Sequence, residues 1–210
     1  MTQAELERLF GAMLTGILTA CAESAAAIPD VHRSTIYKIN YMTALRTTLA
    51  ATSGQVHVVQ TPLEKVGEEI QSLGDNLVEI LSTTLLEDSG IRDLMQELDT
   101  RRSHDTQTRR RWLESNLDEA AQRLDHFLSS SVMDAQESLK KLLDRTLAKD
   151  IVAEAVERFC SEFDELESML EMVDAESGTV VGGDDNATDH VGSLRELYPR
   201  TGAEVRALLS

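Results

Sequence analysis

The sequence has few aromatic residues, few prolines and few cysteines, and these shortages argue against several fold classes. Aromatic residues are 4% of the 210 residues, and the chain has three prolines and two cysteines. A β-sandwich needs β-branched and aromatic strand residues, whereas the alanine, leucine and glutamate that dominate here favour helices. The cysteines, Cys21 and Cys160, lie in apolar helical stretches, which indicates reduced core thiols and no disulfide framework. We therefore expect an acidic all-α protein.

Positive charge is also scarce. Twenty Lys and Arg residues against 37 Asp and Glu residues give a net charge of −17. This charge opposes nonspecific attraction to nucleic-acid phosphates and to anionic lipid. The composition thus argues against a nucleic-acid partner.

Long uninterrupted apolar runs are missing as well. The longest apolar stretch near the start, Met13 to Ala27, contains Thr15, Gly16, Thr19, Glu23 and Ser24. A membrane span needs about 18 apolar residues. We expect no such span, and membrane contact that is peripheral or through partners.

Apolar residues recur at helical spacing along most of the chain. The pattern predicts an antiparallel helical bundle or rod in one domain, 1–210. An Arg-rich connection of low order is expected at 99–112, a mobile acidic and glycine-rich loop at 176–193 and a short helical tail at 194–210. Thr201 to Glu204 (TGAE) is a candidate capping box for that tail. The helices are expected at about 2–26, 33–51, 61–85, 91–98, 114–128, 131–148 and 151–173.

The chain offers no constellation for catalysis, a cofactor or a metal. Its five histidines, His32, His57, His104, His126 and His190, are scattered, and no Gly-rich phosphate cradle is present. Asp184 to Asp189 resembles a calcium loop only weakly, because Asp189 and Arg195 stand where such a loop needs Gly and Glu. We predict that the protein is not an enzyme and that this segment is a solvated acidic loop.

Basic residues cluster before the middle of the chain. Arg109, Arg110 and Arg111 are followed by Trp112, a few residues after Arg101-Arg102. Such a cluster suits a phosphoinositide headgroup or an acidic partner helix. The alternative is a solvated linker whose charge reduces repulsion between acidic helices, with Trp112 anchoring the next helix.

The first helical segment has apolar or small residues over a wide arc, and in both this segment and Tyr37 to Leu49 the apolar content does not match the helix propensity. Apolar stripes serve either as internal core or as a groove for partner helices. We predict a partner-binding surface on these segments at Leu14, Ile17, Leu18, Tyr37 and Tyr41.

Three stretches resemble a known family. Leu14 to Ala25 (LTGILTACAESA), Tyr37 to Leu49 (YKINYMTALRTTL) and Leu197 to Ser210 (LYPRTGAEVRALLS) are similar to blocks of the C-terminal region of subunit 6 of the conserved oligomeric Golgi complex. The blocks have the family's order and approximate spacing, whereas the Arg-rich stretch and the loop at 178–192 depart from its usual form.

The resemblance implies a helical C-terminal domain of a longer, non-enzymatic tether subunit. It further implies a peripheral location on the cytosolic face of Golgi membranes. The expected role is retrograde vesicle tethering through other tether subunits, SNAREs and Rab-type proteins. Other readings are an unrelated acidic helical scaffold or coiled-coil adaptor, and a helical-bundle enzyme with inward carboxylates or histidines.

Overall fold

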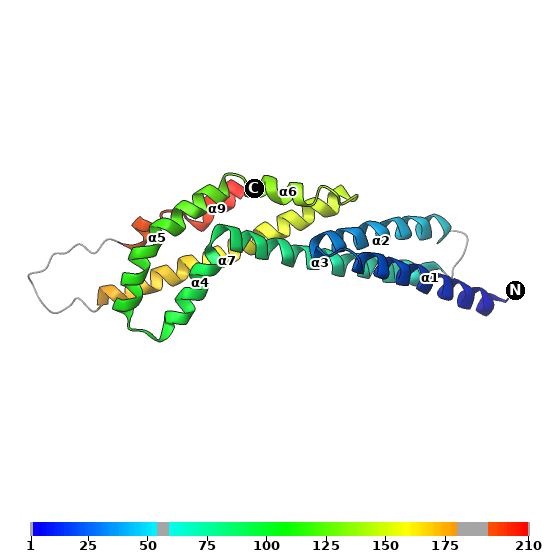
Figure 1. Ribbon diagram of the computed structural model, residues 1–210, viewed down its shortest axis with the longest axis horizontal. Coiled ribbons are helices and arrows are strands. Elements are labelled where there is room, and N and C mark those ends of the chain that lie inside the picture. The colour runs from blue at the N-terminus through cyan, green and yellow to red at the C-terminus, as the bar shows by residue number, and fades with distance from the viewer. Residues whose placement is uncertain (1, 54–58, 180–192, 210) are drawn as a thin grey trace, which may run out of the picture. The chain divides into compact units, whose positions relative to one another are not determined.

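The computed structural model describes residues 2–53, 59–179 and 193–209. Within these ranges the chain forms helices and no strand, so the prediction of an all-α bundle is confirmed (Figure 1). The elements in chain order are α1 (Gln3–Ala26), α2 (Val31–Ser53), α3 (Gln60–Ser89), α4 (Ile91–Thr100), the 3₁₀ turn η2 (Arg101–Ser103), α5 (Thr106–Leu128), α6 (Ser131–Ser138), α7 (Arg145–Thr179), α8 (Leu194–Leu197) and α9 (Gly202–Leu209).

Where one domain was expected, the contacts divide the chain into two compact units. Unit 1 comprises residues 1–80 and 136–152, and unit 2 comprises residues 81–135 and 153–210. Helices α3, α6 and α7 contribute residues to both units. Each unit has its own buried apolar side chains.

Unit 1 is built on a hairpin of α1 and α2. The chain turns at Pro29, and the Asp30 side chain accepts from the Arg33 N–H at 3.1 Å in the first turn of α2. Cys21, Ala25, Ile36 and Ile39 are buried near this turn. Antiparallel helices joined by a short connection are the expected result of such facing apolar stripes.

Asn40 connects α2 to the turn between α6 and α7. Its amide donates to the Lys141 carbonyl at 2.9 Å, and its oxygen accepts from the Leu143 N–H at 2.8 Å. Asparagine has low helix propensity. These two tertiary hydrogen bonds explain why an asparagine stands in the middle of α2 in spite of its low helix propensity.

Unit 2 has a core of aromatic and leucine side chains. Phe127 of α5 packs on Phe159 of α7 with ring centroids 5.3 Å apart, and Phe163 of α7 stacks on Tyr198 at 6.0 Å. The acidic side of α7 faces away from this core, as its sequence pattern predicts: Phe159, Phe163 and Leu166 are fully buried, whereas Glu162 and Glu165 are exposed. Thr201 and Glu204 form the predicted capping box at α9, with bonds of 3.0 and 3.1 Å.

Two segments differ from their expectation. The connection expected at 99–112 is mostly helical: α4 extends to Thr100, and α5 begins at Thr106, where Asp105 accepts from the Thr108 N–H at 3.0 Å. The helix expected at 131–148 is interrupted between Ser138 and Arg145. Asp144 caps the start of α7 by accepting from the Leu147 N–H at 3.1 Å, and such a cap favours a new helix over continuation of α6. The predicted loop at 176–193 and calcium-like segment at 184–189 lie mainly or wholly outside the described residues.

Candidate functional site

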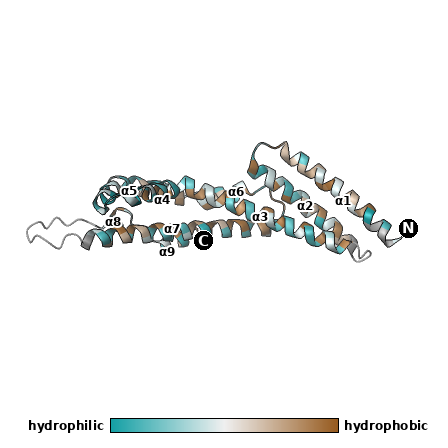
Figure 2. Cartoon of the chain, turned by 90° about the horizontal axis from the view of Figure 1, so that it is seen from below, coloured by the Kyte–Doolittle hydropathy of each residue, from teal (hydrophilic) through white to brown (hydrophobic). Residues whose placement is uncertain are grey.

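Helix α1 is apolar but little covered by the rest of unit 1. Its N-terminus is fixed by a capping box, in which the Glu5 N–H donates to Thr2 Oγ1 at 3.3 Å and the Thr2 N–H donates to Glu5 Oε2 at 2.7 Å. Leu9 and Met13 are 61% and 60% exposed. Cys21 and Ala25, nearer the α1–α2 turn, are buried. The helix is therefore packed at one end and exposed at the other. Figure 2 shows that apolar residues recur along its length.

The expectation that no segment could span a membrane is wrong by the criteria of length and composition. Arg8–Ala26 has 19 residues and a mean hydropathy of 1.4, and 11% of this window is buried. The Thr, Gly and Ser residues that interrupt the run lower the average too little, because they are nearly neutral on this scale. An apolar core helix or a signal sequence meets the same criteria, so this finding alone assigns no membrane role.

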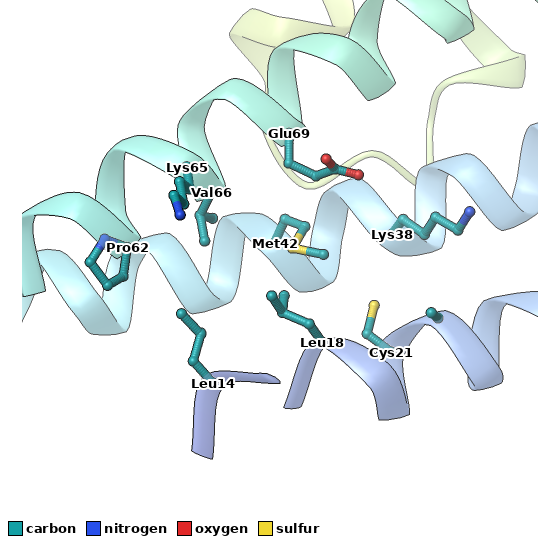
Figure 3. A pocket seen from close by; sticks show the side chains of 10 residues that line it. Leu14, Leu18, Cys21, Lys38, Met42, Pro62, Lys65, Val66 and Glu69 are labelled. Carbon is teal, nitrogen blue, oxygen red and sulfur yellow. The ribbon is translucent and has the colours of Figure 1, made fainter. Parts of the chain in front are cut away.

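A groove of about 390 Å³ lies between α1, α2 and α3 within unit 1. Figure 3 shows Leu14 and Leu18 of α1 pointing toward Met42 of α2 and Val66 of α3. Met42 and Val66 are buried and form its floor, whereas Leu14 and Leu18 are half-buried. The lining residues are Leu14, Leu18, Cys21 and Ala22 of α1, Lys38 and Met42 of α2, and Pro62, Lys65, Val66 and Glu69 of α3.

The structure brings together only part of the predicted partner-binding set. Leu14 and Leu18 line the groove. Ile17 is half-buried on α1 and is not among the lining residues. Tyr37 and Tyr41 stack on each other along α2 with centroids 6.3 Å apart, half-buried, and do not line the groove either. Their role in binding stays a prediction.

The groove does not present an activated nucleophile. Burial raises the pKa of the Cys21 thiol, and nearby Lys38 opposes this shift only in part. The thiolate is the reactive form of cysteine, so a raised pKa leaves Cys21 protonated and unreactive at neutral pH. Cys21 and Cys160 are both buried, so the prediction that they lie in the core is confirmed.

The Arg-rich cluster is largely engaged within unit 2. Arg109 Nη2 lies 2.7 Å from Glu176 Oε2, and Arg110 bonds Glu114 at 2.8 Å and Asp174 at 2.9 Å. Arg110 is 8% exposed, so its charge is shared with α7 and not presented to a ligand. The three ion pairs support the alternative in which the arginines reduce repulsion between acidic helices.

The remaining two members of the cluster differ in exposure. Trp112 is half-buried, and the Arg101 guanidinium lies 4.8 Å from its ring centroid. Arg111 is exposed. Binding of lipid or an acidic partner by the cluster stays a prediction, and Arg111 is the member that the geometry leaves most accessible for it.

Sequence reasoning missed the polar rim of the groove, Lys38, Lys65 and Glu69. No local sequence signal marks this rim, because Lys38 lies on α2 and Lys65 on α3 and only the fold brings them to one groove. Among the residues described, no group of three His, Cys, Asp or Glu side chains is arranged to hold a metal ion. His57 and His190 lie outside those residues.

The chain is similar to one protein family along its whole length. Residues 1–209 match the family model described as conserved oligomeric Golgi complex subunit 6, C-terminal. A subunit 6 from Sclerotinia sclerotiorum is 34% identical over 90% of the chain, and one from Aspergillus niger is 30% identical over 94%. A third, from Chaetomium globosum, is 44% identical over 45% of the chain and 13% of its own length.

The chain spans 27% and 30% of the lengths of the Sclerotinia and Aspergillus relatives. No solved structure gives a significant match. The family match covers both units, so the reading of an unrelated helical scaffold is wrong. The chain belongs to the family defined by the C-terminal region of conserved oligomeric Golgi complex subunit 6.

Proposed function

We propose that this chain is a non-enzymatic region of a Golgi vesicle-tethering subunit and that it acts by binding partner helices. Its partners are other subunits of the conserved oligomeric Golgi complex, together with SNARE and Rab-type proteins. It works in intra-Golgi retrograde transport from the cytosolic face of Golgi membranes, to which it is attached peripherally. Family membership supports the complex, and the helix surfaces support binding as the mode of action.

The exposed apolar half of α1 is the observation that carries this proposal. Leu9 and Met13 are about three-fifths exposed on a helix whose opposite end is packed. Contiguous exposed apolar surface in a folded domain typically marks an interaction site. This surface extends toward the groove through Leu14, Ile17 and Leu18. A second contact surface, which is aromatic, is provided on α2 by Tyr37 and Tyr41.

A tether gains from several such contacts in one assembly. Once one contact forms, the second becomes intramolecular, and its effective concentration reaches the millimolar range for short linkers. Weak contacts to several partners then hold a vesicle near its target without catalysis. The net charge of −17 keeps a protein with exposed apolar surface in solution.

Co-expression with the other subunits of the complex tests the binding role. Leu14→Asp combined with Ile17→Asp is expected to abolish capture of those subunits. Leu9→Asp combined with Met13→Asp is the companion variant, because these exposed side chains can change without disturbing the core. Met133→Asp, at a side chain that is 73% exposed in unit 2, is the matched control and should leave capture unchanged.

Circular dichroism of each variant separates binding from folding. Lost capture with an intact helical signal supports the proposal, whereas full capture by both α1 variants contradicts it. In cells, the same variants should slow the return of a recycling Golgi reporter. Alkaline carbonate extraction should release the protein from Golgi membranes, as expected for peripheral attachment.

A further inference from the structure

The groove between α1, α2 and α3 combines an apolar floor with a positively charged rim. Met42 and Val66 are buried at its base, and Leu14 and Leu18 form the α1 wall (Figure 3). Leu9 and Met13 continue the apolar surface along α1 beyond the groove. An amphipathic helix inserts apolar side chains spaced at i, i+3, i+4 and i+7 into a surface of this kind.

The rim carries two lysines that unit 1 does not neutralise. Lys38 of α2 and Lys65 of α3 line the groove, and neither has an ion pair with any residue that the structure describes. Glu69 is the one acidic side chain in the lining. By contrast, Arg109 and Arg110 in unit 2 are both paired with carboxylates.

Charge is divided unequally between the two units. Unit 1 holds 9 basic and 12 acidic residues, a net charge of −3, whereas unit 2 holds 11 basic and 25 acidic residues, a net charge of −14. Two of only five lysines stand at one apolar groove in the less acidic unit. Complementary charge at a rim selects the partner and speeds its association.

We infer that this groove binds an amphipathic helix of a partner protein whose apolar stripe packs on Leu14, Leu18 and Met42 and whose flanking carboxylates pair with Lys38 and Lys65. The inference rests on the proposed function and specifies the chemistry of the partner.

A bilayer suits this surface less well than a helix. The groove is a concavity between three helices, whereas lipid insertion needs an apolar face that protrudes. Vesicle binding is therefore the competing result that the experiment must distinguish.

The test uses two labelled peptides of about 18 residues, five helical turns, and fluorescence anisotropy with the 210-residue chain. Both peptides carry the same leucine stripe at i, i+3, i+4 and i+7. One has glutamate at the flanking positions and the other has lysine there. The acidic peptide is expected to bind at least about tenfold more tightly, and added salt should reduce the difference because it screens exposed charges.

Charge reversal identifies the residues responsible. Lys38→Glu combined with Lys65→Glu should reverse the preference in favour of the basic peptide. The matched control is Lys141→Glu combined with Lys149→Glu, which changes two exposed lysines of the same unit outside the groove and should preserve the original preference. Leu14→Ala combined with Leu18→Ala should weaken both peptides, and circular dichroism checks the fold of every variant.

Three results would overturn the inference. These are equal binding of both peptides, a preference that survives reversal of Lys38 and Lys65, and binding to vesicles of phosphatidylcholine and phosphatidylserine without binding to either peptide. The proposed function is contradicted by a different result, which is that the chain captures no tether subunit. Peptide selectivity without subunit capture would preserve the inference and contradict the proposed function.

Discussion

Arg110 of α5 and Asp174 of α7 form a mostly buried ion pair, with Nη1 and Oδ1 2.9 Å apart. The same carboxylate accepts from the Leu194 N–H at 3.0 Å and from the Ser193 hydroxyl at 2.7 Å. One side chain therefore joins α5 and α7 and fixes the start of α8.

Asp174→Ala should strongly destabilise the chain. It leaves Arg110 without this partner in a site where the Arg side chain is 10% exposed, and it removes the bond to Leu194. We expect the free energy of unfolding to fall by about 2–4 kcal/mol. This is below the upper range for breaking buried ion pairs, because Asp174 retains some solvent contact. Urea denaturation measures the change. Arg92→Ala, which breaks an exposed pair with Glu87, should cost less than about 1 kcal/mol. Equal losses in the two variants would contradict the structural role of Asp174.

Two glycines should respond oppositely to alanine. A Cβ at Gly202 would collide with the Asp164 carboxylate, and the Gly202 N–H donates to Glu167 Oε2 at 3.0 Å. Gly202→Ala is expected to lower the free energy of unfolding by up to about 1 kcal/mol, because the partly exposed Asp164 carboxylate must turn away and weaken its 2.9 Å bond to Arg206. Gly67→Ala places a methyl group with no atom within 4 Å in the described part of the chain apart from its own helical backbone and chain neighbours. It should raise the free energy of unfolding by up to about 1 kcal/mol, because alanine favours helix. Thermal melts of both variants test the difference in sign, and destabilisation by both would contradict it.

Asn40→Ala should weaken the attachment of the 139–144 turn to α2. The variant removes both side-chain bonds, to the Lys141 carbonyl and to the Leu143 N–H. We expect the free energy of unfolding, measured by urea denaturation, to fall by about 1–3 kcal/mol. Hydrogen exchange should also accelerate at the Leu143 amide. Thr47→Ala is the control on the same helix, since its hydroxyl bonds only the Thr43 carbonyl one turn back. A Leu143 amide that exchanges at an unchanged rate would show that Asn40 does not hold the turn.

The stability of the chain should decline as the pH falls below 6.5, with a contribution from His32. Burial lowers the pKa of His32 below 6.5, with a smaller opposing effect of Asp30 and a smaller reinforcing effect of Arg33. Its Nε2 is buried without a hydrogen-bond partner in the described part of the chain. His32 lines a second pocket, separate from the groove between α1, α2 and α3, and Glu137, Lys140 and Lys141 complete the charged surroundings of His32 there.

The sign follows from proton uptake. The unfolded chain protonates His32 near pH 6.5, but the folded chain does so only at lower pH. Unfolding therefore binds a proton in this window, and the free energy of unfolding falls with pH. Urea denaturation at about pH 7.5 and about pH 5.5 should show a smaller decline for His32→Gln than for the unaltered chain. An identical decline in both would exclude His32 as a source.

Local sequence signals located most helices of this chain. Apolar spacing and end signals act within a few turns, which is why α1, α4 and the capping box at Thr201 and Glu204 lie where the pattern predicts. The break after α6 was not predicted, because Asn40 binds a carbonyl 101 residues away at Lys141. The helical state of 99–112 was missed for a similar reason, since its arginines pair with carboxylates on α7, more than 60 residues later.

The candidate site was predicted only in part. The sequence indicated an apolar surface on the first helix that included Leu14 and Leu18, and both line the groove. It did not show that Leu9 and Met13 are exposed, nor that Lys38 and Lys65 share a rim with the apolar residues.

The amino-acid sequence by itself determined the helical class, the acidic charge and the family resemblance, because propensity, periodicity and composition are properties of the chain before it folds. Only the tertiary structure decided which apolar residues are covered, which arginines are neutralised and which lysines stand free at a groove. Those outcomes depend on contacts between residues far apart in the chain, and a local pattern carries no information about which of two apolar faces finds a partner.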